Sequence, residues 1–190
     1  MVCAFMHVEI ETKLKVGSPA EVERRLTDCG ASFIREVIQT DWYFETADQE
    51  LTRGDRCLRL RSERGGAVER LVLAYKGPKQ KDDVKKRDEV EVQVNDAEAM
   101  ESLLGGLGYR KALAFNKRRR LWMLDGCEVA ADELPLLGGF VEIEGPDSGT
   151  ILGVQAKLGL GGLAHVVESY ARLMDKELSR RGQSRREAYL

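Results

Sequence analysis

Hydrophobic and charged residues alternate along residues 7–16. Even-numbered positions carry Val, Ile, Thr, Leu and Val, whereas Glu9, Glu11, Lys13 and Lys15 occupy odd-numbered positions. A period of two over about ten residues predicts a β-strand with one apolar and one charged face. For a single antiparallel strand, the simplest interpretation of the charged face is exposure to water. Later strands repeat this pattern with their charges sorted by sign, which favours a more specific role.

The rest of the chain predicts further strands separated by turn signals. They are expected at 31–46, 57–61, 68–76 and around 87–94, on either side of Asp125-Gly126, and at 140–144. Gly65-Gly66 and Gly77-Pro78 indicate turns, and Asp125-Gly126 is typical of a two-residue hairpin. A polar turn is expected at 46–54 and a mobile charged loop at 79–88. The pattern therefore predicts about eight mostly antiparallel strands.

Two helices are expected between the strands, and a helical segment near the end. Ser18-Pro19-Ala20-Glu21 is a capping box that opens a helix ending at Gly30, and Asn95-Asp96-Ala97-Glu98 caps the second helix. The apolar residues expected on buried faces are Val22, Leu26 and Cys29, then Met100, Leu103, Leu104 and Leu107, and finally Val166, Val167, Tyr170, Leu173, Met174 and Leu178. We expect one domain over residues 1–180 and a basic, frayed tail at 181–190.

Composition narrows the classes of function. A third of the 190 residues are charged but the formal net charge is −2, which argues against a general nucleic-acid or membrane binder. Four widely spaced cysteines and two histidines form no metal-binding pattern, so a zinc site is not expected. Reduced cysteines, with neither an apolar span nor a signal peptide in the sequence, predict a cytoplasmic protein.

Charged residues on the expected strands form acidic pairs and a larger set of cations. The pairs are Glu9 with Glu11 and Glu142 with Glu144, and the cations are Arg59, Arg61, Lys76, Arg87, Lys117 and Arg119. On an open sheet these residues would form cross-strand salt bridges worth about 0.2–1 kcal/mol each. In a closed barrel they would point into an interior that must be wet or filled by a matching ligand. Phosphates carried by a divalent metal would match both signs of charge. The pattern leaves both architectures open.

The order of the motifs resembles the CYTH superfamily, the triphosphate tunnel metalloenzymes. Glu9-Ile10-Glu11-Thr12-Lys13 is similar to the short Glu-x-Glu-x-Lys signature of that superfamily. It is followed in order by Asp41-Trp42-Tyr43-Phe44, Leu58-Arg59-Leu60-Arg61, Tyr75-Lys76-Gly77-Pro78, Arg87-Asp88-Glu89-Val90-Glu91, Lys117-Arg118-Arg119, Asp132, the run from Leu137 to Glu144, and Glu168-Ser169-Tyr170. The series spans roughly residues 7–175 and is most similar to the class IV adenylyl cyclase branch. Ala74 departs from the family, which often has a hydroxyl residue there.

This resemblance implies an α+β fold built on an eight-stranded, mostly antiparallel closed β-barrel, a triphosphate tunnel with helices packed outside. It implies that Mg²⁺ or Mn²⁺ is held by Glu9, Glu11, Glu142 and Glu144, with Asp132 as a helper. The triphosphate would be bound by Lys13, Arg59, Arg61, Lys76, Arg87, Lys117 and Arg119. Glu9, Glu11, Lys13 and Lys76 are the candidate catalytic residues.

Three functions remain open. The resemblance favours an adenylyl cyclase that converts ATP to cyclic AMP and pyrophosphate. The alternative enzyme is a triphosphatase acting on inorganic triphosphate, thiamine triphosphate or nucleoside triphosphates. A third reading is a non-catalytic module that binds polyphosphate or RNA ends through residues 117–120. Alternation along a strand sends Arg118 and Arg120 to the opposite face from Lys117 and Arg119, so we expect the first two in solvent. The expected partner is a small-molecule triphosphate, with neither nucleic acid nor membrane, and a homodimer is compatible with the sequence.

Overall fold

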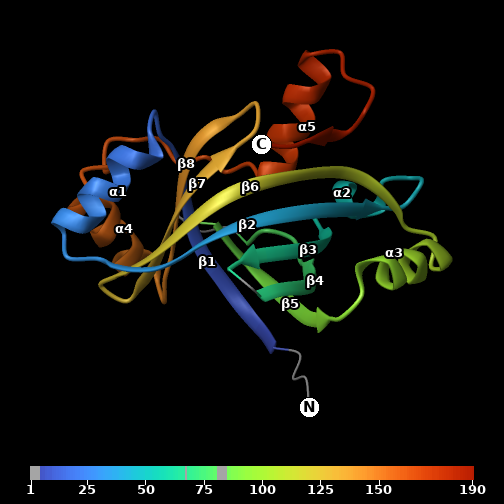
Figure 1. The fold of residues 1–190 in the computed structure, drawn as a ribbon, viewed down its shortest axis with the longest axis horizontal. Coiled ribbons are helices and arrows are strands. Elements are labelled where there is room, and N and C mark those ends of the chain that lie inside the picture. The colour runs from blue at the N-terminus through green and yellow to red at the C-terminus, as the bar shows by residue number, and fades with distance from the viewer. Residues whose placement is uncertain (1–4, 67, 81–84) are drawn as a thin grey trace.

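The computed structural model describes residues 5–66, 68–80 and 85–190, which contain nine strands and five helices (Figure 1). The strands are β1 (Phe5–Lys15), β2 (Ser32–Glu45), β3 (Cys57–Gly65), β4 (Val68–Lys76), β5 (Lys85–Val94), β6 (Arg110–Leu124), β7 (Cys127–Leu134), β8 (Gly138–Glu144) and β9 (Glu187–Ala188). The helices are α1 (Pro19–Asp28), α2 (Glu50–Arg53), α3 (Ala97–Gly106), α4 (Ser148–Lys157) and α5 (Tyr170–Arg180).

Eight antiparallel strands close into a barrel. Their order is β2-β3-β4-β5-β1-β8-β7-β6, and β2 pairs with β6 to complete the ring. The β2–β6 ladder runs from Ser32 opposite Met123 to Glu45 opposite Arg110 and contains two irregularities in register. The expected hairpin between β6 and β7 is present, with Asp125 and Gly126 both at positive φ. The α+β barrel that the resemblance implied is confirmed.

Most of the apolar core lies outside the barrel. On β1 and β8, Leu14, Val141 and Ile143 point outward and pack with Leu26 of α1 and Ile151 of α4. On the opposite side, α3 places Leu104 against Phe44 of β2 and Leu60 of β3. Removal of this apolar area from water contributes about 25 cal/mol per Å² to the folding free energy. Because the apolar residues face the helices, the alternating charged residues must face the barrel interior.

Helix α5 is an exception to the expected packing outside the barrel. Its residues Met174 and Leu178 pack with Phe115 of β6, Leu134 of β7 and Phe140 of β8. These three strand residues lie an even number of positions from Lys117, Asp132 and Glu142, so they belong to the same face as the charged interior. Helix α5 therefore covers the inner face of β6–β8 at one end of the barrel.

The C-terminal segment also differs from the expectation. Instead of fraying, β9 pairs in parallel with β6, where Glu187 lies opposite Ala114 and the backbone N–H of Ala114 donates to the carbonyl of Arg186. Ala188 is buried against the α5 cluster. The final helix begins at Tyr170, so the predicted burial of Val167 is wrong, and its side chain is 67% exposed.

Four smaller differences from the expected structure concern a turn, a helix cap, the exposed face of a helix and a loop. The polar turn at 46–54 contains α2, and the backbone N–H groups of Leu51 and Thr52 in this helix donate to the Glu45 carboxylate. Ser18 occupies the N-cap of α1 without a capping side-chain hydrogen bond, whereas Asp96 caps α3 as expected. Leu103 and Leu107 of α3 are exposed. The charged loop is shorter than expected because β5 begins at Lys85, and residues 81–84 of that loop lie outside the described residues. Within the described ranges, no helix is long and apolar enough to cross a membrane.

Candidate functional site in the barrel interior

The barrel encloses a cavity of about 900 Å³ that is lined by charged side chains. Eleven of the twelve residues expected at the site line it: Glu9, Glu11, Lys13, Arg59, Arg61, Lys76, Arg87, Lys117, Arg119, Glu142 and Glu144. The twelfth, Asp132, is fully buried behind Lys117 and Arg119. Arg118 and Arg120 point outward and pair with Glu133 and Glu36, so the expected strand faces are confirmed.

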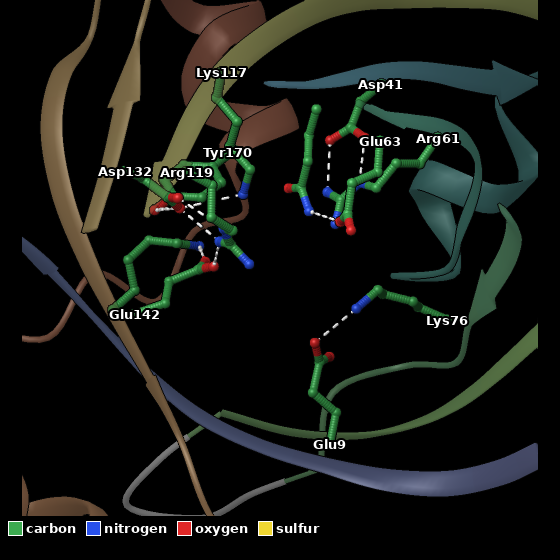
Figure 2. A network of polar contacts seen from close by, with 12 residues as sticks. Glu9, Asp41, Arg61, Glu63, Lys76, Lys117, Arg119, Asp132, Glu142 and Tyr170 are labelled. Carbon is green, nitrogen blue, oxygen red and sulfur yellow. Dashed lines mark hydrogen bonds and ion pairs between the residues drawn. The ribbon is translucent and has the colours of Figure 1, made fainter. Parts of the chain in front are cut away.

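Asp132 is the centre of a connected group of polar contacts beside the cavity, which we call the Asp132 network (Figure 2). Its carboxylate accepts from Nε of Arg119 at 2.7 Å and Nη2 at 2.5 Å, from Nζ of Lys117 at 3.1 Å, and from the hydroxyl of Tyr170 at 2.8 Å. Arg119 also pairs with Glu142, which lies 3.2 Å from Nζ of Lys13. These five residues and Lys13 form a connected set in which the protein supplies its own counter-ions.

Burial shifts the titration of two members of the Asp132 network. Burial, followed by repulsion from Arg119, lowers the pKa of Lys117 to about 7, although Asp132 and Glu142 oppose the shift. Burial also raises the pKa of Tyr170 well above its ordinary value, and the Asp132 charge adds to this effect. The Tyr170 hydroxyl therefore stays protonated and acts as a donor, while an anion bound beside Lys117 would favour its charged form.

A second ion pair fixes Arg61. Its Nε and Nη2 donate to the two oxygens of Asp41 at 2.6 and 2.8 Å (Figure 2). Burial alone would raise the pKa of the Asp41 carboxyl, but the charge and hydrogen bonds of Arg61 outweigh it and hold the pKa well below its usual range. The bidentate edge of Arg61 is therefore already occupied by a protein carboxylate.

Two cations on strands β3–β5 are held less completely than Lys76, which bridges Glu9 at 2.7 Å and Glu89 at 2.9 Å. Arg59 approaches Glu91 only to 3.7 Å and Glu89 to 3.9 Å, and its buried Nε has no hydrogen-bond partner among the described residues. In the same described part of the chain, the buried Nε of Arg87 has none either, whereas its Nη2 donates to the carbonyl of Asp55 at 3.3 Å. Buried donors are normally satisfied, so these two guanidinium groups have unused capacity that anionic oxygens would fill.

An acidic cluster occupies adjacent strands. Glu11 of β1 and Glu128 of β7 lie on either side of Glu144 of β8 in the strand register. Burial first, and then the charges of Glu9, Glu11 and Glu128, raise the pKa of Glu144 to about 7. A bound cation would offset both the burial of these carboxylates and their repulsion.

The acidic cluster fits a hard divalent metal in donor chemistry and in charge. Carboxylate oxygens are the ligands that Mg²⁺ and Mn²⁺ prefer. Across the described parts of the chain, no three Asp, Glu, His or Cys side chains lie close enough together to hold an ion without moving. Binding would therefore draw the carboxylates of Glu9, Glu11 and Glu144 toward one another.

Part of the cavity lining is apolar, and we call Tyr43, Leu51, Leu113 and Ala171 its apolar wall. Tyr43 and Leu113 lie opposite each other on β2 and β6, and Ala171 of α5 packs against the same cluster. All three line the cavity, together with Leu51 of α2. A phosphate chain has no apolar surface, so this wall suits the organic part of a ligand.

Several site residues were missed in the sequence. Asp41 and Glu89 carried a signal in the sequence. Glu89 alternates with Arg87 on one face of its strand, and Asp41 lies opposite Arg61 on the neighbouring strand. Carboxylates among the inward cations were not considered as counter-ions of those cations. Glu128 alternates with Asp132 and could have been found in the same way. Tyr170 was expected on the buried face of the final helix and in the Glu168-Ser169-Tyr170 motif, but its place among the charged residues depends on the packing of α5.

Comparisons with known proteins agree with this architecture. The CYTH domain model matches residues 7–156. A Methanocaldococcus jannaschii protein provisionally named an adenylate cyclase is 32% identical over 137 residues, which cover 72% of this chain and 76% of that protein. Adenylate cyclase CyaB of Aeromonas hydrophila is 30% identical over 106 residues, covering 55% of this chain and 51% of that protein, so the match spans about half its length.

Solved structures share the fold. A Pyrococcus horikoshii protein superposes with a TM-score of 0.78 at 27% identity, covering 89% of this chain and 99% of that one. A Hippeastrum protein, provisionally named an adenylyl cyclase and described as having a dominant triphosphatase activity, gives a TM-score of 0.66 at 20% identity, covering 92% and 96%. The second likeness shows the fold alone.

Proposed function

The chain belongs to the CYTH family, and from this premise we propose that it is a metal-dependent adenylyl cyclase that converts ATP to cyclic AMP and pyrophosphate. The observation that carries the proposal is the composition of the cavity, which joins a cationic interior, an acidic cluster and an apolar wall. Triphosphate alone would use the first two, whereas a nucleotide would use all three. The names of the two curated relatives support the same choice.

In this proposal the cations divide the work of binding the phosphate chain. Arg59 and Arg87, whose Nε atoms have no hydrogen-bond partner among the residues that the structure describes, bind phosphate oxygens directly. Lys76, Lys13 and Lys117 add point charges along the chain. Asp41 occupies one edge of the Arg61 guanidinium, and Asp132 occupies one edge of the Arg119 guanidinium. These two arginines contribute their remaining N–H groups.

The acidic residues receive two different roles. Glu9, Glu11 and Glu144, with Glu142, would hold Mg²⁺ or Mn²⁺, which supplies Lewis-acid polarisation of phosphate oxygens when bound. Asp132 differs, since it is fully buried behind the cavity lining, where it accepts from Lys117, Arg119 and Tyr170. We assign it to anchoring these donors instead of the metal role that the resemblance implied.

The chemical step forms one bond and breaks another at the α-phosphorus. The oxygen of the ribose 3′-hydroxyl attacks the α-phosphorus and gives up its proton to water, and the bond from that phosphorus to the oxygen bridging to the β-phosphate breaks, which releases pyrophosphate. Charge builds up on the departing pyrophosphate, and preorganised cations such as Arg59, Lys76 and Arg87 stabilise it. The residues thereby lower the barrier without forming a covalent intermediate.

Triphosphate hydrolysis is the second candidate, and it is the activity described for the Hippeastrum structural relative. Water would attack the terminal phosphorus, and the same cations would stabilise the departing anion. The apolar wall would then have no essential role. Product identity separates the two reactions.

The deciding experiment offers ATP, inorganic triphosphate and thiamine triphosphate in parallel, with Mg²⁺, with Mn²⁺ and with excess chelator. We expect cyclic AMP and pyrophosphate from ATP only when metal is present, and loss of both products in Glu11→Gln. Arg118→Gln, on the outer face, is the matched control and should retain turnover. Orthophosphate without cyclic AMP would establish the triphosphatase instead, and binding without any product would establish a binding module.

A further inference from the structure

Tyr170 enters the charged interior from a part of the chain outside residues 7–156, which the family model matches. It is the first residue of α5, and it is buried, with 7% of its surface exposed. Figure 2 shows it beside Lys117 and Asp132. The residue therefore joins the C-terminal segment to the Asp132 network, which the barrel strands otherwise build.

The aromatic ring of Tyr170 lies close to two ammonium groups. Nζ of Lys13 is 4.1 Å from the ring centroid and Nζ of Lys117 is 4.7 Å from it. Both distances fall within the range of about 6 Å in which an ammonium is attracted to an aromatic face. The ring thus contacts two like charges that would otherwise repel each other in a buried space.

Further contacts hold the Tyr170 hydroxyl and the Lys13 ammonium in place. Its hydroxyl donates to Asp132 at 2.8 Å, and Asp132 in turn accepts from Lys117 and Arg119. The backbone of the preceding segment also holds Lys13, whose Nζ donates to the carbonyl of Glu168 at 3.2 Å. Lys13 is therefore held between β1, the Tyr170 ring and this carbonyl.

Helix α5 is in turn anchored to the barrel by the C-terminal segment. Met174 and Leu178 are fully buried, and Arg186 donates to Ser179 at 3.1 Å and pairs with Asp175. The backbone N–H of Leu190 donates to Asn116 of β6 at 2.7 Å. These contacts leave the Tyr170 ring little freedom to move away from the lysines.

We propose that Tyr170 is a positioning residue, which holds the ammonium groups of Lys13 and Lys117 where they meet the phosphate chain of the substrate. This inference rests on the proposed binding of a triphosphate in the cavity. It assigns to the C-terminal segment a direct part in the site, beyond covering the inner face of the barrel. Tyr170 acts through the two lysines and does not itself touch the reacting atoms.

The test measures binding of inorganic triphosphate with Mg²⁺ by calorimetry in a double-mutant cycle. Tyr170→Leu should weaken binding about tenfold or more, because it removes attraction to two ammonium groups. In a Lys13→Met, Lys117→Met background the same change should cost less than about twofold, since its targets are gone. Tyr189→Leu, a half-exposed tyrosine of the same segment, is the matched control and should bind as the wild type does. Equal losses in both backgrounds would overturn the proposal, because a merely structural tyrosine would act independently of the lysines.

A second series keeps the shape of the ring and so preserves folding. Replacing Tyr170 by phenylalanine and then by phenylalanines with one, two and three ring fluorines weakens the attraction of the face for cations in steps. Affinity for triphosphate should fall steadily along the series, and unchanged or tighter binding would overturn the proposal. Failure of the wild type to bind any triphosphate would instead refute the proposed function, so the two failures are distinguishable.

Discussion

The two sides of the tunnel treat their cations differently. In the Asp132 network on β6–β8, the buried carboxylate of Asp132 holds Arg119 and Lys117 and also accepts from the Tyr170 hydroxyl, and Arg119 pairs with Glu142 as well. On β3–β5, Arg59 and Arg87 each keep a buried Nε that no described residue accepts from. The first side is assembled before a ligand arrives, whereas the second side keeps donors that a ligand can satisfy. The comparison shows that equal charge along a tunnel does not mean equal availability.

The contrast has a physical basis in the cost of burying charge. A buried cation without a counter-ion costs several kcal/mol, so the protein must supply anions or leave the group partly hydrated. Asp132 does the first for β6–β8, and Asp41 does it for Arg61 on β3. Removing a carboxylate that pairs with a buried cation should therefore damage the fold, and changing Arg59 or Arg87 should damage binding.

The largest effect is expected from Asp132→Asn. The change leaves Lys117 and Arg119 without their shared carboxylate, and removing one partner of a buried ion pair costs about 3–5 kcal/mol. We expect a fall of that size in the free energy of unfolding, measured by urea denaturation. Glu133→Gln breaks only the exposed pair with Arg118 and should cost less than about 1 kcal/mol. Equal losses of stability in Asp132→Asn and Glu133→Gln would contradict the structural role of the Asp132 network.

The acidic cluster predicts an unusual dependence of stability on pH in metal-free protein. The pKa of Glu144 is raised from 4.5 to about 7, so between these values the folded state binds a proton more tightly than the unfolded chain. The free energy of unfolding should therefore fall as pH rises through this window, by an amount on the order of 3 kcal/mol.

Thermal unfolding in chelator from pH 5 to pH 8 tests this expectation. Glu144→Gln has no proton to lose, so it should show a flatter profile and exceed the wild type in stability at pH 8. Adding Mn²⁺ should restore wild-type stability most strongly at high pH, where Glu144 is ionised. A wild-type profile that rises toward pH 8 in chelator would contradict the raised pKa.

Ligand binding should stabilise the protein by joining the two sides. At a concentration of one hundred times Kd, a ligand that binds only the native state contributes about 2.7 kcal/mol. For a chain of this length the melting midpoint should rise by about 5–10 °C with inorganic triphosphate and Mg²⁺. Orthophosphate is too short to reach both sides and should give a much smaller shift. A response independent of phosphate chain length would contradict the tunnel as a binding site.

The smallest of the expected effects separates two arginines on one strand. Arg59→Lys should weaken triphosphate binding about tenfold with little change in stability, because its fork is available to the ligand. Arg61→Lys should lower stability as well, since its fork holds Asp41. Calorimetry and urea denaturation on both variants, with Arg118→Lys as the control, measure the split. Identical behaviour of Arg59→Lys and Arg61→Lys would show that occupation by Asp41 is irrelevant.

Much of the site was predictable because alternation is a local property. Once Glu9, Glu11 and Lys13 were placed on one face of β1, the inward set on the other strands followed from the same period of two. That rule separated Lys117 and Arg119 from Arg118 and Arg120, and the structure confirms the separation. The resemblance then identified the fold, which pattern alone had left open between a sheet and a barrel.

The tertiary structure decided everything that depends on which distant strands pair. Closure rests on hydrogen bonds between β2 and β6, and the sequence contains no local signal for them. Pairing of β6 with β7 brings Asp132 to Lys117 and Arg119, and pairing of β8 with β1 and β7 brings Glu144 opposite Glu11 and Glu128, so the strand order determines which charges are satisfied and which repel. Helix α5 could have packed on either face, and its placement on the inner face, with β9 paired to β6, put Tyr170 among the lysines. Periodicity specifies the face of a residue within its strand, whereas its partners follow from long-range contacts that form only when the chain folds.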